Sequence, residues 1–294
     1  MNSNDDARPV VVGYDSSGAG DAAFDWARAE AERHQRPLTL LVARGVLYAA
    51  APGMGAAAPW PEGLTHELVD AARTYAADRA SGVRLTVESG LGTPAALLVD
   101  ASKEADLVVV GRQKHTVVGE AFWGSTSTQV VAHAHCPVVV VDRPVPVSKS
   151  APIVVGVDGS EESGAALEFA FRRAGDLDAP VVAVHAWWVD VPDHLSAGVL
   201  SGPAIDGIES AARALLEDAV EPWTTKFPDV KVRKVLERRY PQDAVLAWGD
   251  DAQLIVVGSR GHGGFVGLLL GSVSQSLLHQ SDRKCPLAVV HAGR

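Results

Sequence analysis

Short apolar runs alternate with helical patterns along the first half of the chain. Pro9–Tyr14 is a continuous valine-rich run bounded by Gly13, which is typical of a strand buried on both faces. Residues 22–33 then place small and apolar positions at helical spacing, with a charged far side and a stop near Pro37. Continued in this way, the pattern predicts strands Pro9–Tyr14, Leu38–Ala43, Arg84–Glu88, Leu107–Val110 and Val138–Val141, and helices Ala22–Arg33, Glu67–Ala80, Pro94–Lys103 and Ser125–His133.

The second half repeats this alternation. It predicts strands Ile153–Val157, Val181–Ala186, Lys231–Leu236, Leu254–Val257 and Leu287–Val290, and helices Glu161–Ala174, Ile208–Thr225, Gln242–Asp250 and Val273–His279. Strict alternation of strand and helix implies a parallel sheet with right-handed crossovers. We therefore expect an α/β protein of two tandem doubly wound domains, each a five-stranded parallel sheet of order 3-2-1-4-5 with helices on both faces.

The two halves also resemble each other residue by residue. Val10-Val11-Val12-Gly13-Tyr14-Asp15-Ser16-Ser17 returns as Ile153-Val154-Val155-Gly156-Val157-Asp158-Gly159-Ser160, and Cys136-Pro137 returns as Cys285-Pro286. A repeat of about half the chain length indicates two copies of one domain. We assign residues 7–142 to the first domain, 143–152 to a stiff, proline-rich linker, and 153–292 to the second domain. The Ala-, Pro- and Gly-rich stretches Gly45–Gly63 and Val189–Gly207 are interpreted as long loops.

Composition narrows the classes of partner. The 294 residues carry a formal charge of −10, which argues against binding to nucleic acid or to an anionic membrane. The first six residues are polar and acidic, unlike a signal peptide, and no apolar run approaches the ~20 residues that span a bilayer. We expect a cytoplasmic protein.

The two cysteines, Cys136 and Cys285, each precede a proline that opens an apolar strand, which favours small buried residues over metal ligands. The only candidate metal site is His133-Ala134-His135-Cys136, and we expect none.

A glycine motif follows the fourth strand of the second copy: Gly258-Ser259-Arg260-Gly261, nine residues, then Gly271-Ser272. Glycines allow backbone amides to approach a ligand, and the N-terminus of the following helix suits a phosphate. Glycine-rich turns also occur after strands without any ligand, so the spacing alone leaves both interpretations open.

Asp158 favours the ligand interpretation. It ends strand one, which neighbours strand four at the point where the winding reverses, and open α/β sheets bind ligands there. A carboxylate repels phosphate, so Asp158 would meet ribose hydroxyls, the amino group of a base, or Mg²⁺. The alternative is that Asp158 caps the first helix, a role for which Ser160 competes.

These residues, with the Cys-Pro before the last strand, resemble the universal stress protein family in its tandem, ATP-binding form, over essentially the whole chain. The resemblance implies ATP, with Mg²⁺ as a candidate companion, held by the glycine motif, the strand-one Asp and the backbone after strand two. Carried onto this chain, the nucleotide contacts of the second domain are Val157, Asp158, Ala186, Gly258, Arg260, Gly261, Gly271, Ser272, Val273 and Ser274.

The first copy departs from the motif, because Lys114 stands where the second glycine belongs. Lysine could supply charge to a phosphate, or it could fill the space that the phosphate needs. We expect the two sites to be unequal. The corresponding candidates are Asp15, Ala43, Gly111, Lys114, Gly124, Ser125 and Ser127.

Three functions compete. The favoured one is a nucleotide-dependent regulator of stress or growth with at most slow ATP hydrolysis; no catalytic residues are assigned. Efficient hydrolysis is disfavoured because the chain has no Walker-type Gly-x4-Gly-Lys-Ser/Thr and no evident base in the motif. The third is a nucleotide-independent interaction module with vestigial pockets, which the intact Gly258, Gly261 and Gly271 argue against.

The last strands suggest how the chain assembles. Val138–Val141 and Leu287–Val290 are apolar and end their domains, so each is expected at a sheet edge, which proteins usually cover. We expect the two domains to pair through these strands about a pseudo-two-fold axis, as the resemblance also implies. A further homodimer is expected from the resemblance.

Overall fold

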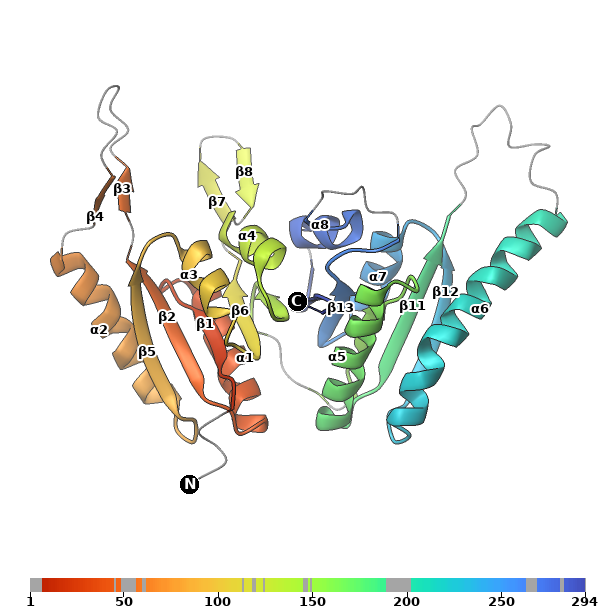
Figure 1. Cartoon of the computed structure of the whole chain (residues 1–294), viewed down its shortest axis with the longest axis horizontal. Helices are drawn as coiled ribbons and strands as arrows, with labels where there is room; N and C mark the ends of the chain where they lie inside the picture. The colour runs from red at the N-terminus through yellow and green to blue at the C-terminus, as the bar shows by residue number, and fades with distance from the viewer. Residues whose placement is uncertain are drawn as a thin grey trace. The chain divides into compact units, whose positions relative to one another are not determined.

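Two α/β units follow one another along the chain, divided between Pro144 and Val145 (Figure 1). A computed structural model describes residues 7–44, 46–48, 57–59, 62–112, 114–117, 120–123, 125–144, 148, 150–188, 202–262, 269–280 and 283–293.

The first unit is a parallel five-stranded sheet of order β5-β2-β1-β6-β9. Helices α1 and α3 both contact β1 and β2, and α3 also packs against α4. The strands are β1 (Val10–Gly13), β2 (Leu38–Arg44), β5 (Leu85–Leu91), β6 (Leu107–Gly111) and β9 (Val138–Val141), and the helices are α1 (Gly18–Arg33), α2 (Glu62–Arg79), α3 (Pro94–Ala101) and α4 (Ser125–His133).

The second unit has the same plan, with the sheet order β12-β11-β10-β13-β14. Helix α5 packs against α6, and α7 packs against α8. Numbered along the chain within each unit, both orders are 3-2-1-4-5, which confirms the predicted fold. The strands are β10 (Ile153–Gly156), β11 (Val181–Trp187), β12 (Val232–Arg238), β13 (Leu254–Gly258) and β14 (Leu287–Val290), and the helices are α5 (Glu161–Leu177), α6 (Gly202–Lys226), α7 (Pro241–Gly249) and α8 (Ser272–His279).

The valine-rich runs form the centre of each sheet because helices cover both of their faces. Ile153, Val154 and Val155 of β10 are fully buried. Phe171 of α5 is also fully buried, and its ring lies 6.0 Å from that of Phe227, just after α6. Burying a phenylalanine side chain contributes roughly 1.5–3 kcal/mol, so Phe171 contributes substantially to the packing of α5 against the end of α6.

The structure differs from the sequence prediction mainly between the core elements. Gly45–Gly63 was expected to be a loop, but β3 (Val46–Tyr48) pairs antiparallel with β4 (Ala57–Pro59). In the first unit β7 (Lys114–Val117) also pairs antiparallel with β8 (Glu120–Trp123). Such short pairs carry too few alternating positions to give a sequence signal.

Three helices begin at least four residues earlier than predicted: α1 at Gly18, α2 at Glu62 and α6 at Gly202. Each of these helices has a glycine in its first two positions, and glycine does not contribute to the apolar periodicity. Most of the predicted loop Val189–Gly207 lies outside the described residues. Across the described part of the chain, no helix has the length and apolarity needed to cross a membrane.

Candidate functional site

The second unit has a cavity of about 440 Å³ at the carboxyl ends of its central strands. Strands β10 and β13 are neighbours in parallel register, with Val155 opposite Val256, and the winding of the sheet reverses between them. Strand β10 ends at Gly156, opposite Val184, whereas β11 continues to Trp187 and forms one wall of the crevice. The volume falls within the range of about 300–1,000 Å³ that is usual for small-molecule pockets.

All the residues predicted for the second domain line this cavity. The structure also brings in residues that the sequence analysis did not select, from the ends of β10, β11 and β13, from the starts of α5 and α7, and from the glycine loop. These additional residues are Gly156, Ser163, Val184, Pro241, Val245, Val257 and His262. Pro241 and Val245 belong to α7, whose approach to the crevice follows from the crossover and has no local sequence signal.

Asp158 is held as an ionised carboxylate at the centre of the site. Its Oδ1 accepts hydrogen bonds from the Ser160 amide (3.0 Å) and hydroxyl (2.5 Å), and its Oδ2 accepts one from the His262 amide (3.2 Å). Burial alone would raise the pKa of Asp158, but the hydrogen bonds from Ser160 and His262 outweigh it and lower the pKa. The N-cap of α5 is Ser160, whose hydroxyl accepts from the Ser163 amide, so Asp158 is not the helix cap.

Two glycines of the motif sit where a side chain would not fit. A Cβ at Gly261 would overlap Oδ2 of Asp158, and one at Gly258 would lie 2.8 Å from the backbone carbon and Cβ of Glu162. The glycine loop therefore passes in direct contact with the corner between β10 and α5. Residues 263–268 of this loop lie outside the described residues.

The N-terminus of α8 supplies backbone donors to the same cavity. Its N-cap is Gly271, which makes no side-chain capping bond, and Ser272 and Val273 of the first turn line the cavity. Unpaired amides at a helix N-terminus suit an anion. The buried hydroxyl of Ser274 donates to the carbonyl of Gly258 (2.6 Å), so this residue fastens α8 to β13 rather than offering its proton to a ligand.

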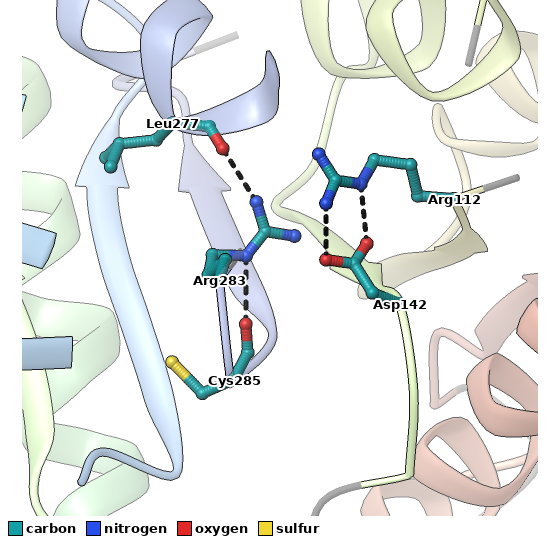
Figure 2. Close-up of polar contacts among 5 residues, drawn as sticks. All are labelled: Arg112, Asp142, Leu277, Arg283 and Cys285. Atoms are coloured by element: carbon teal, nitrogen blue, oxygen red, sulfur yellow. Dashed lines mark hydrogen bonds and ion pairs between the residues drawn. The ribbon is translucent and has the colours of Figure 1, made fainter. Parts of the chain in front are cut away.

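A buried arginine fixes the other end of α8, as Figure 2 shows. The guanidinium of Arg283 donates to the carbonyl of Leu277 (2.7 Å), in the last turn of α8, and to the carbonyl of Cys285 (2.9 Å), just before β14. In the first unit Arg112 forms a bidentate ion pair with Asp142, in which Nε and Nη2 each donate to a carboxylate oxygen at 2.7 Å (Figure 2). Arg283 therefore joins α8 to the start of β14, and Arg112 joins the ends of β6 and β9.

The opposite end of the cavity is apolar. Val184, Ala186, Pro241 and Val245 line it beside Val157. His185 is buried, and because a carbonyl can only accept, its Nδ1–H donates to the carbonyl of Val157 (2.7 Å). This bond fixes the strand end that leads into Asp158. The cavity thus joins an apolar end to an end rich in backbone donors, with a carboxylate between them.

The candidates of the first domain are only partly described. Asp15 is exposed, and its Oδ1 accepts from the Ser17 amide (3.1 Å) and hydroxyl (2.6 Å). A Cβ at Gly111 would lie 2.7 Å from the backbone of Ala19, just as a Cβ at Gly258 would lie 2.8 Å from Glu162. Ala43 lies in β2 and Ser127 is buried in α4. Lys114 begins β7 and Ser125 begins α4, but their side chains, and Gly124 altogether, lie outside the described residues.

The side chains of His133 and Cys136, in the histidine–cysteine segment, have structural roles. His133 Nδ1–H donates to the carbonyl of Gln129 (2.9 Å), and Cys136 is buried, which raises the pKa of its thiol to about 12. No group of three potential metal ligands occurs among the residues that the structure describes.

The family model and two similar relatives point to the same family. The model of the universal stress protein family matches residues 7–142 and 150–291. A universal stress protein of Mycolicibacterium smegmatis is 38% identical over 289 residues, covering 96% of both chains. One of Mycobacterium tuberculosis is 34% identical over 300 residues, covering 94% of this chain and 95% of the relative.

A solved structure agrees at the level of the fold. The crystal structure of a universal stress protein from Archaeoglobus fulgidus matches with a TM-score of 0.68 at 18% identity and covers 100% of both chains. Two family matches along one chain also support the tandem arrangement. The chain belongs to the universal stress protein family.

Proposed function

We propose that the second domain binds ATP and that the protein is a cytoplasmic, nucleotide-dependent regulator of the stress response. The observation that carries this proposal is the convergence of Asp158, the glycine loop and the N-terminus of α8 on one cavity. Each feature alone has a structural explanation, but together with the apolar end of the cavity they provide contacts for the base, the ribose and the phosphates of a nucleoside triphosphate.

The chemistry of the two ends sets the orientation of the ligand. The phosphates would lie against Gly261 and the first-turn amides of α8, where backbone donors gather. The base would lie in the apolar end, beside Ala186 and Pro241. Asp158, between them, would accept from ribose hydroxyls or hold Mg²⁺, because a carboxylate facing bare phosphate oxygens would be repelled.

The same geometry disfavours rapid hydrolysis. Asp158 is the carboxylate that lines the cavity, and it already accepts three hydrogen bonds. Its lowered pKa makes it a poor base for activating water. We therefore expect ATP to act mainly as a bound signal, with at most slow turnover.

The first domain is proposed to bind nucleotide differently from the second. Lys114 replaces the second motif glycine and is itself the first residue of β7 in the β7–β8 pair. Changing Lys114→Gly should raise either the number of ATP molecules bound or the affinity of the weaker site. Identical titrations of wild type and variant would show that this departure has no effect.

The proposal is tested with the full-length protein. First, purified protein is denatured, and the supernatant is examined by mass spectrometry for adenine nucleotide that co-purified with it. Second, ligand-free protein is titrated with ATP, with and without Mg²⁺. Binding of ATP in a stoichiometric amount is expected. Failure to bind any adenine nucleotide would favour the alternative, an interaction module with vestigial pockets.

A further inference from the structure

An acidic residue stands directly behind the phosphate end of the cavity and has no role in the function proposed so far. Glu162, in the first turn of α5, forms an ion pair with Arg260 of the glycine motif, with Oε1 and Nη2 2.9 Å apart. Arg260 lines the cavity. The cation that would attract phosphate is thus already paired with a carboxylate.

On the basis of the proposed ATP site, we propose that the Glu162 carboxylate is the counterion of Arg260 and occupies the place that a phosphate group of the ligand would take. It pairs with Arg260 while the phosphate end is empty, and a polyphosphate must take its place on the guanidinium. Glu162 thereby weakens binding through the phosphates without touching the base, and sets how strongly the site distinguishes ATP from adenosine.

The two partners differ in their freedom to move. The Glu162 side chain is 15% exposed, and its Cβ and backbone lie against Gly258 so closely that a Cβ on this glycine would be 2.8 Å away. The Arg260 side chain is 46% exposed. Glu162 is therefore the fixed member, and Arg260 can turn from its carboxylate to an incoming phosphate.

The first domain lacks both the acid and the arginine. Ala19 occupies the place of Glu162, because a Cβ at Gly111 would lie 2.7 Å from the Ala19 backbone, just as a Cβ at Gly258 would lie 2.8 Å from Glu162. By sequence, Gln113 corresponds to Arg260. The first copy has neither partner of the pair, although it has the aspartate and the N-cap serine. The pair is thus a separate feature, added to a common frame in the second domain.

A simpler role for Glu162 is to stabilise the N-terminus of α5, where acidic residues are favoured by the helix dipole. Glu161 occupies the same first turn and would serve that role equally well. It is exposed and is not among the cavity residues. Glu161→Gln is therefore the matched control, since it removes the same charge from the same helical turn.

The test compares Glu162→Gln and Glu161→Gln with wild type, in the full-length protein, by calorimetric titration with ATP and with adenosine. We expect Glu162→Gln to tighten ATP binding by roughly three- to tenfold, because a carboxylate near the phosphates is removed, and to leave adenosine unchanged. Glu161→Gln should change the ratio of the two affinities far less. Urea unfolding of each variant checks that the fold is intact.

Weaker ATP binding by a folded Glu162→Gln protein, or an unchanged ratio of ATP to adenosine affinity, would overturn this inference alone. If neither wild type nor the variants bind adenosine or ATP, the proposed function fails as well. The two failures are distinguishable, because the first is measured on a protein that still binds nucleotide.

Discussion

Asp158 and its counterpart Asp15 show how one residue can be used in two ways. Both accept two hydrogen bonds through Oδ1 from the serine that caps the next helix. Asp158 also accepts from the His262 amide through Oδ2, which joins β10 to a loop 104 residues later in the chain. That contact fixes the glycine loop over the sheet, and it is possible only because position 261 has no side chain.

The first prediction concerns this close approach. Gly261→Ala places a methyl group on Asp158 Oδ2, so the carboxylate or the loop must shift. Such overpacking typically costs about 1–3 kcal/mol, and we expect ATP affinity to fall roughly tenfold or more. Gly175→Ala, in exposed helix with its nearest neighbour 3.9 Å from the new Cβ, is the control and should bind as wild type. Equal affinity of the two variants would contradict the assigned loop position.

A second prediction concerns acid. Because hydrogen bonds lower the folded-state pKa of Asp158, its contribution to stability is fully present above its ordinary pKa of about 3.9 and is lost as pH falls through the lowered value. The difference in urea midpoint between wild type and Asp158→Asn should therefore be constant from about pH 7 to 5 and shrink below about pH 4. A difference that persists unchanged to about pH 3 would argue against an ionised, hydrogen-bonded carboxylate.

At the scale of single residues, the sequence predicted the location of the cavity residues better than it predicted the role of each one. The family resemblance selected Ser274 as a nucleotide contact, yet its hydroxyl donates to the carbonyl of Gly258. The direction of a hydroxyl depends on where β13 ends relative to α8, which is a tertiary property. Pro241 and Val245 reach the crevice only through packing of α7 and carry no motif.

At the scale of elements, helix caps position the site. Ser160 caps α5 and Ser17 caps α1 with the same geometry, each accepting from the amide three residues later. In each case the serine hydroxyl also donates to the preceding aspartate. A helix start and a site carboxylate are therefore set by one side chain in both domains.

A third prediction uses this matched pair. Ser160→Ala and Ser17→Ala should each destabilise their domain by about 1 kcal/mol, the usual cost of losing an N-cap, as measured by urea unfolding. Only Ser160→Ala should weaken ATP binding at the second-domain site, because it also releases Asp158. Loss of affinity at that site in both variants would indicate a general effect of stability.

Elements with a strong period were predictable and the connections between them were not. Runs such as Val108–Val110 and Val154–Val155 are typical of strands buried on both faces, which predicts the strand count, and right-handed crossovers narrow the possible strand orders. The strands of the β3–β4 and β7–β8 pairs have only three or four residues, too few to show alternation, so pairing across the turn decides the structure.

At the scale of the whole molecule, the chain presents one domain plan twice with different chemistry at the same place. The first copy has Lys114 and Ala19 where the second has Gly261 and Glu162. The frame that the copies share, namely the sheet order, the aspartate and the capping serine, has been kept, while the charged groups near the phosphate end differ. We therefore expect the two domains to differ in their affinity for one ligand.

The arrangement of the domains gives a fourth prediction. The sequence predicts that the last strands, β9 and β14, pair about a pseudo-two-fold axis, and this stays a prediction. Small-angle scattering should then give a radius of gyration of about 19 Å for a compact monomer, or about 25 Å for a compact homodimer. Scattering from two separate, flexibly tethered domains would refute the pairing.

The central claim is that the second-domain crevice binds ATP. Its most direct test is calorimetric titration of ATP into full-length wild type, Asp158→Ala and Asp15→Ala, all shown to be folded. We predict that wild type has a tighter site, that Asp158→Ala abolishes or strongly weakens it, and that Asp15→Ala leaves it intact. Binding by Asp158→Ala that is indistinguishable from wild type would contradict the claim.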